Sequence, residues 1–243
     1  MSNRFKKPWT ADLAWQTGFL KLEVGFGVTV EEIKTLVGRP VGVNLEPVPP
    51  TTLEGGFPRG HVAGVETARR AVELGADYIV VTGNPQTGVT TTLISKAVRE
   101  IVSEVGKQVI VIAGKMHGAG LGTEDLADPL TVDSFLEAGA DIVLLPSPGT
   151  TPGTRVECIA SLVDCIHQRK KLVMTSIGTS QESAEKETVS QIALLSKMTG
   201  ADILHIGDAG YGGMALPENL MAFGTAIRGR RHTYRRMALS LRR

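Results

Sequence analysis

The chain has 243 residues, of which 42% are hydrophobic and 21% are charged, and its formal net charge is only +1. This length and composition indicate one globular domain and match the roughly 250 residues of a typical α/β barrel. No apolar run approaches the ~20 residues that a membrane helix needs, and the basic N-terminus lacks the apolar core of a signal peptide. We therefore expect a cytoplasmic protein that does not span a membrane.

The first 40 residues give few signs of regular structure. Residues 1–23 form an atypical N-terminal segment, and residues 19–24 are compatible with a strand. Residues 29–37 predict a helix, because Thr29 suits the N-cap position and two glutamates follow in the first turn. At most one strand is therefore predicted before residue 41.

From residue 41 onward, two interleaved repeats predict alternating strands and helices. The first is the tripeptide Gly-Ala-Asp, which begins at Gly75, Gly139 and Gly200 and each time links a helix to a short apolar strand. Glycine suits the left-handed position after a helix. A short apolar run that begins directly after this tripeptide is typical of a parallel strand buried on both faces. The strands of this repeat are residues 78–81, 142–145 and 203–206. The strands of the second repeat are residues 41–46, 109–115 and 172–178.

The two repeats together supply six strands with a helix after each. Strict alternation favours a parallel sheet, and so regular a repeat favours a closed barrel over a doubly wound sheet. The sequence therefore predicts a single (β/α)8 TIM-type barrel across residues 1–243 that lacks one or two N-terminal strands. An open barrel exposes the edges of strands, so we also expect association into a homo-oligomer.

Polar or glycine-rich residues follow every predicted strand. Because the active sites of such barrels lie at the C-terminal ends of the strands, these residues predict a site at that end. The candidates for substrate binding are Asn44, Thr82, Asn84 and Ser176. Turns favour several of these residue types even without a ligand, but charged residues beside apolar strands are not explained in that way.

The last two strand ends have the pattern of a phosphate site. The candidate residues are Gly178, Thr179, Ser180, Gly207, Ala209 and Gly210. Glycines let backbone N–H groups approach an anion, hydroxyls add donors, and a helix N-terminus adds partial positive charge. Helices are predicted to begin soon after these loops, near Gln181 and at Pro217, the favoured first position of a helix.

Four ionisable residues beside the strands are candidate catalytic groups: Glu46, Lys115, His117 and Asp208. Lys115 can form a Schiff base with a carbonyl or stabilise an enolate as a fixed cation. Glu46 suits a general base and His117 a proton donor, whereas Asp208 suits orienting an amide or binding a hydroxyl or a metal. His205 lies inside a predicted strand, and we interpret it as a core histidine.

A metal site is the alternative for the same group of residues. Glu46, His117 and Asp208 offer oxygen and nitrogen ligands to a divalent metal that would support hydrolysis. Their spacing matches no metal-binding signature, so the sequence predicts no cofactor and ranks this alternative second.

The C-terminal residues 228–243 contain seven arginines and no acidic residue. Such a basic tail can bind nucleic acid through phosphate charge, but neither an aromatic platform nor a nucleic-acid-binding fold accompanies it. We expect the tail to pack against the barrel or another subunit and not to bind nucleic acid.

Five motifs at the strand ends occur in a distinctive order. They are residues 43–47 (VNLEP), 82–89 (TGNPQTGV), 113–120 (AGKMHGAG), 176–182 (SIGTSQE) and 205–211 (HIGDAGY). Across residues 24–237 the chain resembles an uncharacterised bacterial TIM-barrel family that is often labelled haloacid-dehalogenase-like hydrolase. The resemblance implies the barrel fold and a site at these loops, and it implies two further strands at the start of other members. The hydrolase label does not fit, because the chain lacks the Asp-x-Asp-x-Thr motif of haloacid dehalogenases.

These patterns favour a phosphate-binding barrel that acts as a lyase or isomerase on a phosphorylated small carbonyl compound or sugar. A non-catalytic or truncated metabolite-binding barrel is the first alternative. The strand end at Thr82-Gly83 and the Gly-Ala-Asp repeat support it, because both faintly resemble barrel proteins related to a photosystem assembly factor. A metal-dependent hydrolase is the second alternative.

Overall fold

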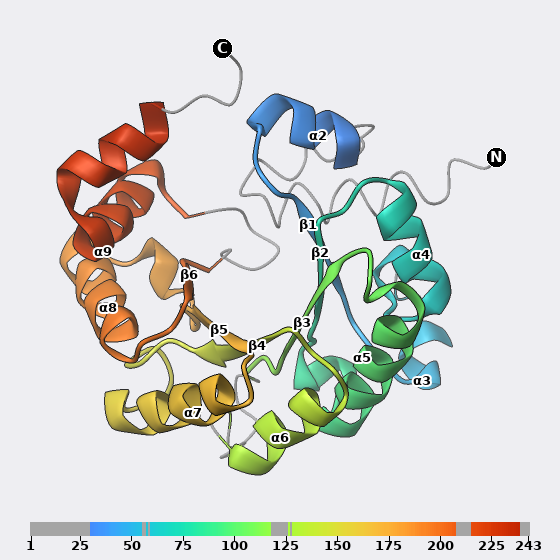
Figure 1. Ribbon diagram of the computed structural model, residues 1–243. Coiled ribbons are helices and arrows are strands. Elements are labelled where there is room, and N and C mark those ends of the chain that lie inside the picture. The colour runs from blue at the N-terminus through green and yellow to red at the C-terminus, as the bar shows by residue number, and fades with distance from the viewer. Residues whose placement is uncertain are drawn as a thin grey trace.

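The computed structural model describes residues 30–54, 57, 59–117, 126, 128–207 and 215–238. Six parallel strands alternate with helices in this part of the chain, as the two repeats predict (Figure 1). The strands are β1 (Gly42–Leu45), β2 (Tyr78–Val81), β3 (Ile110–Gly114), β4 (Ile142–Pro146), β5 (Leu172–Ser176) and β6 (Ile203–His205). The six strands predicted within residues 41–206 are confirmed to within two residues at each end, whereas residues 19–24 lie outside the described residues.

The order of the strands in the sheet is their order in the sequence, and every neighbouring pair is parallel. The sheet curls, and the helices lie on its outer side (Figure 1). This arrangement is that of the (β/α)8 barrel, so the predicted fold class is confirmed.

The helices agree with the sequence except near Gln181. They are α2 (Val30–Val37), α3 (Pro50–Glu54), α4 (Val65–Glu73), α5 (Thr91–Val105), α6 (Pro129–Glu137), α7 (Val156–Gln168), α8 (Lys186–Met198) and α9 (Pro217–Ala238), with 3-10 turns η1 (Arg59–His61), η2 (Pro85–Thr87) and η3 (Gln181–Ser183). The helix predicted near Gln181 is a 3-10 turn, and α8 begins only at Lys186. Among the helices that the structure describes, none has both the length and the apolar character needed to cross a membrane.

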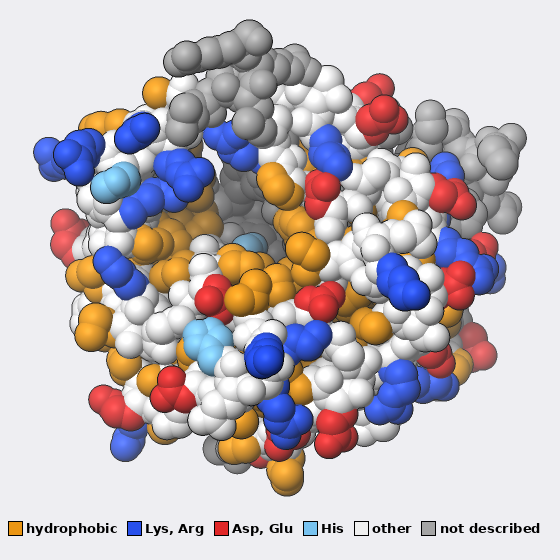
Figure 2. Space-filling view, in the orientation of Figure 1, with side chains coloured by type: hydrophobic (Ala, Val, Ile, Leu, Met, Phe, Trp, Pro, Cys, Tyr) orange, Lys and Arg blue, Asp and Glu red, His pale blue; other side chains and the backbone are white. Residues whose placement is uncertain are grey.

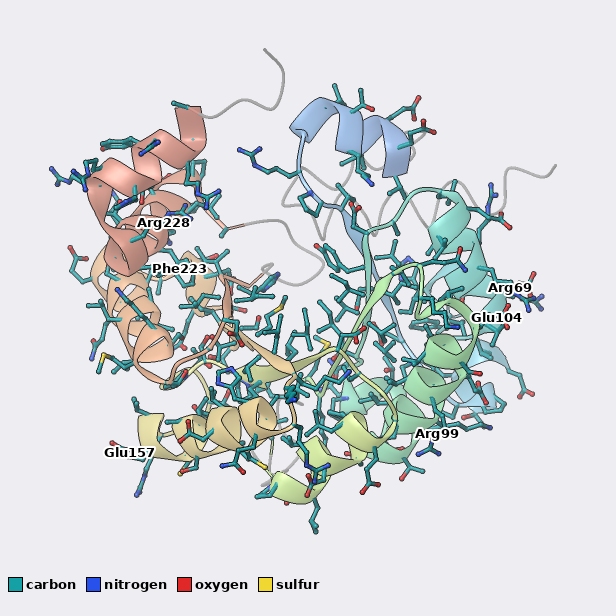
Figure 3. All side chains as sticks on the ribbon, viewed as in Figure 1. Arg69, Arg99, Glu104, Glu157, Phe223 and Arg228 are labelled. Atoms are coloured by element: carbon teal, nitrogen blue, oxygen red, sulfur yellow. The ribbon has the colours of Figure 1, made fainter. Side chains whose placement is uncertain are left out.

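Helix α9 takes in part of the predicted basic tail. Gly229 interrupts it with φ +74°, and a second helical segment runs from there to Ala238. Arg228, which Figure 3 labels, lies just before this bend, and Lys and Arg side chains gather over this corner of the surface (Figure 2). The Arg39 side chain, from the segment between α2 and β1, donates a 3.4 Å hydrogen bond to the carbonyl of Arg236. The end of α9 therefore contacts the segment that leads into β1.

Side chains of the strands alternate between two apolar layers. The outer layer packs strand residues such as Val43 and Val143 against helix residues such as Ile94 and Ile159. Around the same outer side, Arg69 of α4 pairs with Glu104 of α5 at 2.6 Å (Figure 3). Phe223 of α9, also labelled there, packs with Val189 and Ile192 of α8.

The described residues of the inner layer all belong to strands. Its members are Tyr78, Val80, Ile112, Ile142, Leu144, Met174 and Ile203. Gly42 and Gly114 make room for two of them, because a Cβ at Gly42 would overlap the Tyr78 ring and one at Gly114 would lie 2.7 Å from Leu144 Cβ. Figure 2 shows the molecule hollowed at its centre, with hydrophobic side chains around the hollow.

Each Gly-Ala-Asp copy forms the same joint at the N-terminal end of the sheet. The three glycines have φ values of +90°, +100° and +84°, so the predicted left-handed positions are confirmed. The aspartate of each copy, here called a repeat aspartate, accepts a hydrogen bond from a backbone amide near the start of the preceding strand. The bonds are Val41 to Asp77 (2.8 Å), Val111 to Asp141 (3.1 Å) and Val173 to Asp202 (2.9 Å).

Every repeat aspartate also has a basic partner. Asp77 pairs with Lys34 at 2.8 Å, Asp141 with Lys171 at 3.2 Å and Asp202 with His167 at 2.9 Å. A carboxylate bonded both to an amide and to a basic side chain is a strong, charge-assisted link. The repeat that predicted the fold therefore also connects its strands.

Candidate functional site

The C-terminal ends of the strands form the rim opposite the repeat aspartates. The alternation set by the inner layer identifies the residues that face the interior at this rim. They are Glu46, Thr82, Gly114, Pro146, Ser176 and His205. No inner-facing position of the six described strands carries a lysine.

Glu46 is the buried carboxyl of the rim beside β1. Its side chain is only 7% exposed, and its Oε2 accepts a hydrogen bond from Thr87 Oγ1 at 3.3 Å. Burial raises the pKa of Glu46, and this effect outweighs the lowering by hydrogen bonds from the Asn84 amide and Thr87. A carboxyl with a raised pKa can both take up and release a proton, as a general base requires.

Two neighbours of Glu46 have polar atoms without a partner. Asn44 and Thr82 are each 6% exposed, and neither Asn44 Oδ1 nor Thr82 Oγ1 has a hydrogen-bond partner within the described chain. An unsatisfied buried polar atom destabilises the folded state, which makes such atoms candidates for contact with a ligand. Asn44, Glu46 and Thr82 form what we call the β1–β2 cluster.

Asn84 has a different local role. Its Oδ1 accepts a hydrogen bond from the amide of Gln86 at 2.9 Å and so caps the turn η2. Its backbone carbonyl also accepts from Thr87 Oγ1, at 2.7 Å, so this carbonyl and Glu46 share the single proton of the Thr87 hydroxyl. The residue therefore holds the loop that carries Thr87 to Glu46, and its substrate-binding role stays a prediction.

On the other side of the sheet, Ser176 and His205 form the polar pair of the rim. They are partners in the register of β5 and β6, and Ser176 Oγ lies 3.0 Å from His205 Nδ1. The amide of Gly207 donates to the same nitrogen at 3.0 Å. His205 is only partly buried, unlike the core histidine that the sequence suggests. The sequence does contain a signal for this: His205 stands between Leu204 and Ile206, two apolar residues whose side chains lie on the opposite face of β6.

The predicted phosphate residues after β5 have an unusual backbone. Thr179 and Ser180 have φ values of +57° and +58°, and a β-branched residue rarely adopts this left-handed conformation. The Thr179 hydroxyl donates to the carbonyl of Thr150 at 2.6 Å, which fixes the loop to the one after β4. Because α8 begins only at Lys186, the predicted helix N-terminus does not directly follow Ser180.

Glu182 is a buried carboxyl beside this loop that the sequence patterns did not single out. It is 2% exposed, and a Cβ placed on Gly207 would lie 3.5 Å from its Oε2. Asn219 at the start of α9 donates to the carbonyls of Glu182 and Ala184, both at 2.8 Å. The loop after β5 is therefore held to the start of α9, and Gly207 lies beside it. Ser176, His205, Gly207 and residues 178–180 form what we call the β5–β6 cluster.

Lys115 lies at the C-terminal end of β3. It follows β3 by one residue and has the phase of Val111 and Ala113, which pack in the outer layer. Burial acts to raise the pKa of Asp128, but hydrogen bonds at the start of α6 and the charge of Lys115 lower it overall. Lys115 is therefore close to the N-terminus of α6. His117 is partly buried two residues further on.

The remaining predicted residues cannot be placed. Asp208, Ala209 and Gly210 lie outside the described residues. Across the ranges that are described, no group of three His, Cys, Asp or Glu side chains is arranged to hold a metal ion. The metal alternative includes Asp208, so it stays a prediction.

Comparison with solved structures identifies similar barrels. A deoxyribose phosphate aldolase from Aeropyrum pernix, described as a unique tetramer, matches with a TM-score of 0.56 and 14% identity over 94% of this chain and 81% of its own. An archaeal fructose 1,6-bisphosphate aldolase matches with a TM-score of 0.50 and 15% identity over 80% of this chain and 81% of its own. At these identities the similarity establishes the fold alone.

Comparison of sequences identifies the family. No curated protein matches the chain. The model of a family described as a domain of unknown function, DUF7916, matches residues 17–243. The match begins inside the atypical segment 1–23, before the residues 24–237 that carry the resemblance described above, and the haloacid-dehalogenase label is not supported. The chain belongs to the DUF7916 family.

Proposed function

We propose that this protein binds a phosphorylated carbonyl compound, such as a sugar phosphate, at the C-terminal rim and acts on it as a lyase or isomerase. The observation that carries the proposal is the left-handed backbone of both Thr179 and Ser180. Such conformations cost on the order of 1–3 kcal/mol each and concentrate at functional sites. No acceptor within the described chain faces the amides of these two residues, so both can donate to an anion.

The β1–β2 cluster supplies groups for the other end of the substrate. Glu46 is a buried carboxyl with a raised pKa, and Asn44 and Thr82 add unpaired polar atoms suited to a hydroxyl or carbonyl. The two clusters belong to opposite ends of the described sheet, with the apolar inner layer between them. A phosphate at the β5–β6 cluster and a carbonyl turned toward Glu46 would use both.

The distribution of lysines favours proton abstraction over Schiff-base chemistry. Inner-facing positions of the six strands carry none, and Lys115 has the phase of the outer layer. A reaction in which Glu46 removes a proton beside a carbonyl needs no amine, so isomerisation or epimerisation fits the described residues best. A Schiff base at Lys115 and proton donation by His117 remain part of the proposal as its less favoured form.

The names of the two similar structures support the substrate class by analogy. Both are aldolases whose names contain a phosphorylated sugar. Unrelated reactions often share this fold, so the analogy extends to phosphorylated sugars and not to aldol cleavage. Association into a homo-oligomer also stays a proposal, which light scattering of the purified protein tests.

Hydrogen exchange in D2O tests the proposed reaction. The purified protein is mixed with triose, tetrose or pentose phosphates, or with the unphosphorylated sugars, and the proton beside the carbonyl is followed by NMR. We expect the protein to accelerate exchange of this proton in the phosphorylated compounds only. A chelator should not change the rate of exchange. Glu46→Gln should reduce the rate by about 100-fold or more, since general bases contribute at least that much. Glu185→Gln, an exposed change of the same kind, is the control and should leave it unchanged.

The other outcomes separate the alternatives. A thermal shift with a sugar phosphate but no exchange would support the non-catalytic binding barrel. Release of phosphate from these compounds that stops when chelator is added would support the metal-dependent hydrolase. If no phosphorylated compound either shifts the melting temperature or exchanges, the proposed function is wrong.

A further inference from the structure

The two unpaired atoms of the β1–β2 cluster differ in the partner that each requires. Asn44 Oδ1 is an acceptor only, so it requires a donor, and no group of the described chain donates to it. Thr82 Oγ1 both donates and accepts, and it also has no partner within the described residues. The hydroxyl of Thr87, from the loop beside the cluster, is already shared between the Asn84 carbonyl and Glu46 Oε2.

The neighbouring inner-facing positions offer no polar side chain to this cluster. Asn44 is opposite Val80 in the strand register, and Val80 is opposite Ile112, so the residues beside Asn44 on this face are apolar. At the rim of β3 the inner-facing residue is Gly114, which has no side chain. Leu144 already occupies the space beside it, since a Cβ on Gly114 would lie 2.7 Å from Leu144 Cβ. The missing donor therefore fits a group that a ligand supplies.

A hydroxyl group satisfies both atoms, whereas other groups of a sugar phosphate do not. The proton of a hydroxyl can be donated to Asn44 Oδ1, and its oxygen can accept the proton of Thr82 Oγ1. A carbonyl oxygen has no proton and leaves Asn44 Oδ1 unsatisfied. A methylene group, as in a deoxy sugar, leaves both atoms unsatisfied.

We propose that Asn44 and Thr82 bind the hydroxyl on the carbon beside the substrate carbonyl, and that they select hydroxylated sugar phosphates over the deoxy compounds that lack this group. The proposal deepens the proposed function and rests on it, because Glu46 acts on the same carbon. Glu46 lies two residues beyond Asn44, on the same face of the sheet. Sites that hydrogen-bond a substrate hydroxyl reject analogues without it, because buried polar groups of the protein are then left unpaired.

This role differs from that of two side chains that hold a buried structural water. A structural water satisfies both atoms whether or not a ligand is bound. Removal of either side chain would then alter the stability of the fold and leave the choice between ligands unchanged. In the proposed role, the same substitutions reduce the preference for the hydroxylated ligand.

Binding of matched pairs of ligands to the full chain tests the selection. Calorimetry compares ribose 5-phosphate with 2-deoxyribose 5-phosphate, and 3-phosphoglycerate with 3-phosphopropionate as an open-chain pair. We expect the wild-type protein to bind the hydroxylated member of a pair about 10-fold or more tightly than its deoxy partner, because an unpaired buried polar atom weakens binding by that order.

Two variants connect this preference to the cluster. Thr82→Val and Asn44→Leu remove the polar atoms and keep side chains of similar size. We expect each to weaken binding of the hydroxylated member by about 10-fold and to leave binding of the deoxy member within about threefold of wild type. Thr92→Val, the same change at an exposed position of α5, is the control and should keep the wild-type preference.

The outcomes distinguish failure of this inference from failure of the proposed function. Equal affinity of the wild-type protein for both members of each pair would overturn the selection by Asn44 and Thr82 alone. A preference that persists unchanged in both variants would overturn it as well, since the two atoms would then have a structural role. If none of the four compounds binds to the wild-type protein, the phosphate site of the proposed function is wrong.

Discussion

Polar side chains at the two ends of the sheet differ in whether they have hydrogen-bond partners within the described chain. At the N-terminal end, each repeat aspartate bonds to a strand amide and to a basic side chain. At the C-terminal rim, Asn44 and Thr82 have buried polar atoms with no partner within the described chain, and Ser180 has a left-handed backbone. The repeat aspartates at one end are therefore paired within the chain, whereas the rim retains groups whose partners would come from a ligand.

The carboxyls of the two ends show the same contrast. Burial acts to raise the pKa of Asp202, but hydrogen bonds from His167 and the Val173 amide lower it overall. Burial also raises the pKa of Glu46, and there the hydrogen bonds are too weak to reverse the effect. The fold therefore favours the ionised form of Asp202 and the protonated form of Glu46.

Removal of a repeat aspartate should have the largest effect on stability. Asp202→Ala leaves the amide of the fully buried Val173 without its partner, and hydrogen bonds to charged groups contribute about 1.5–3 kcal/mol. We expect a loss of about 2–3 kcal/mol in the free energy of unfolding, measured with urea. Asp164→Ala, an exposed change on α7, is the control. A loss no larger than that of the control would show that the repeat aspartates do not hold the strands.

The pH dependence of stability should differ in sign between the two ends. Asp202 has a lowered pKa, so it stabilises the fold above its unfolded pKa, and this contribution is lost as pH falls toward the folded value. Glu46 has a raised pKa, so the fold loses stability as pH rises from the unfolded value through the folded one. We expect Glu46→Gln to gain stability relative to wild type at neutral pH and Asp202→Ala to lose it, with both differences shrinking in acid. Urea unfolding across the acid range measures this, and parallel curves for the two variants would contradict it.

The unpaired hydroxyl of Thr82 offers a test of the rim. Thr82→Val removes the unsatisfied atom at nearly constant volume, and we expect a gain of about 1 kcal/mol in stability together with weaker binding of sugar phosphates. Thr199→Val is the matched control, because the buried Thr199 hydroxyl already donates to the Ser196 carbonyl at 2.7 Å. The control should lose stability. If both variants lose stability, the Thr82 hydroxyl has a hydrogen-bond partner in the folded protein, and it is not an atom left open for a ligand.

The N-terminal end could be predicted from sequence far better than the rim. The Gly-Ala-Asp repeat is local, since helix end, left-handed glycine and strand start lie within a few residues, and all three copies form the predicted joint. Its aspartate hydrogen bonds were not foreseen, because they join residues 29 to 36 positions apart.

To predict which residues face the interior at the rim, one must know on which face of the sheet the last residue of each strand lies. Lys115 lies one residue past β3, where the alternation of the strand no longer fixes the side chain, and its catalytic role at the barrel mouth stays a prediction. His205 was interpreted as a core residue because its flanks are apolar, although those flanks face the opposite side. Residues 179 and 180 were selected for their composition, and only the structure shows that both have a positive φ.

The smallest effects should come from the backbone, again with opposite signs at the two ends. Gly75→Ala places a Cβ at φ +90° where no atom lies within 4 Å, so only the left-handed conformation is penalised, by about 1 kcal/mol. Ser180→Gly relieves a similar penalty but gives the unfolded chain more freedom, so we expect a net gain of only about 0.5 kcal/mol. Thr179 is less suitable, because its hydroxyl also bonds to Thr150. Thermal unfolding should resolve shifts of about 1–4 °C. If Ser180→Gly lowers stability, the serine side chain itself holds the loop, and its backbone no longer argues for a ligand.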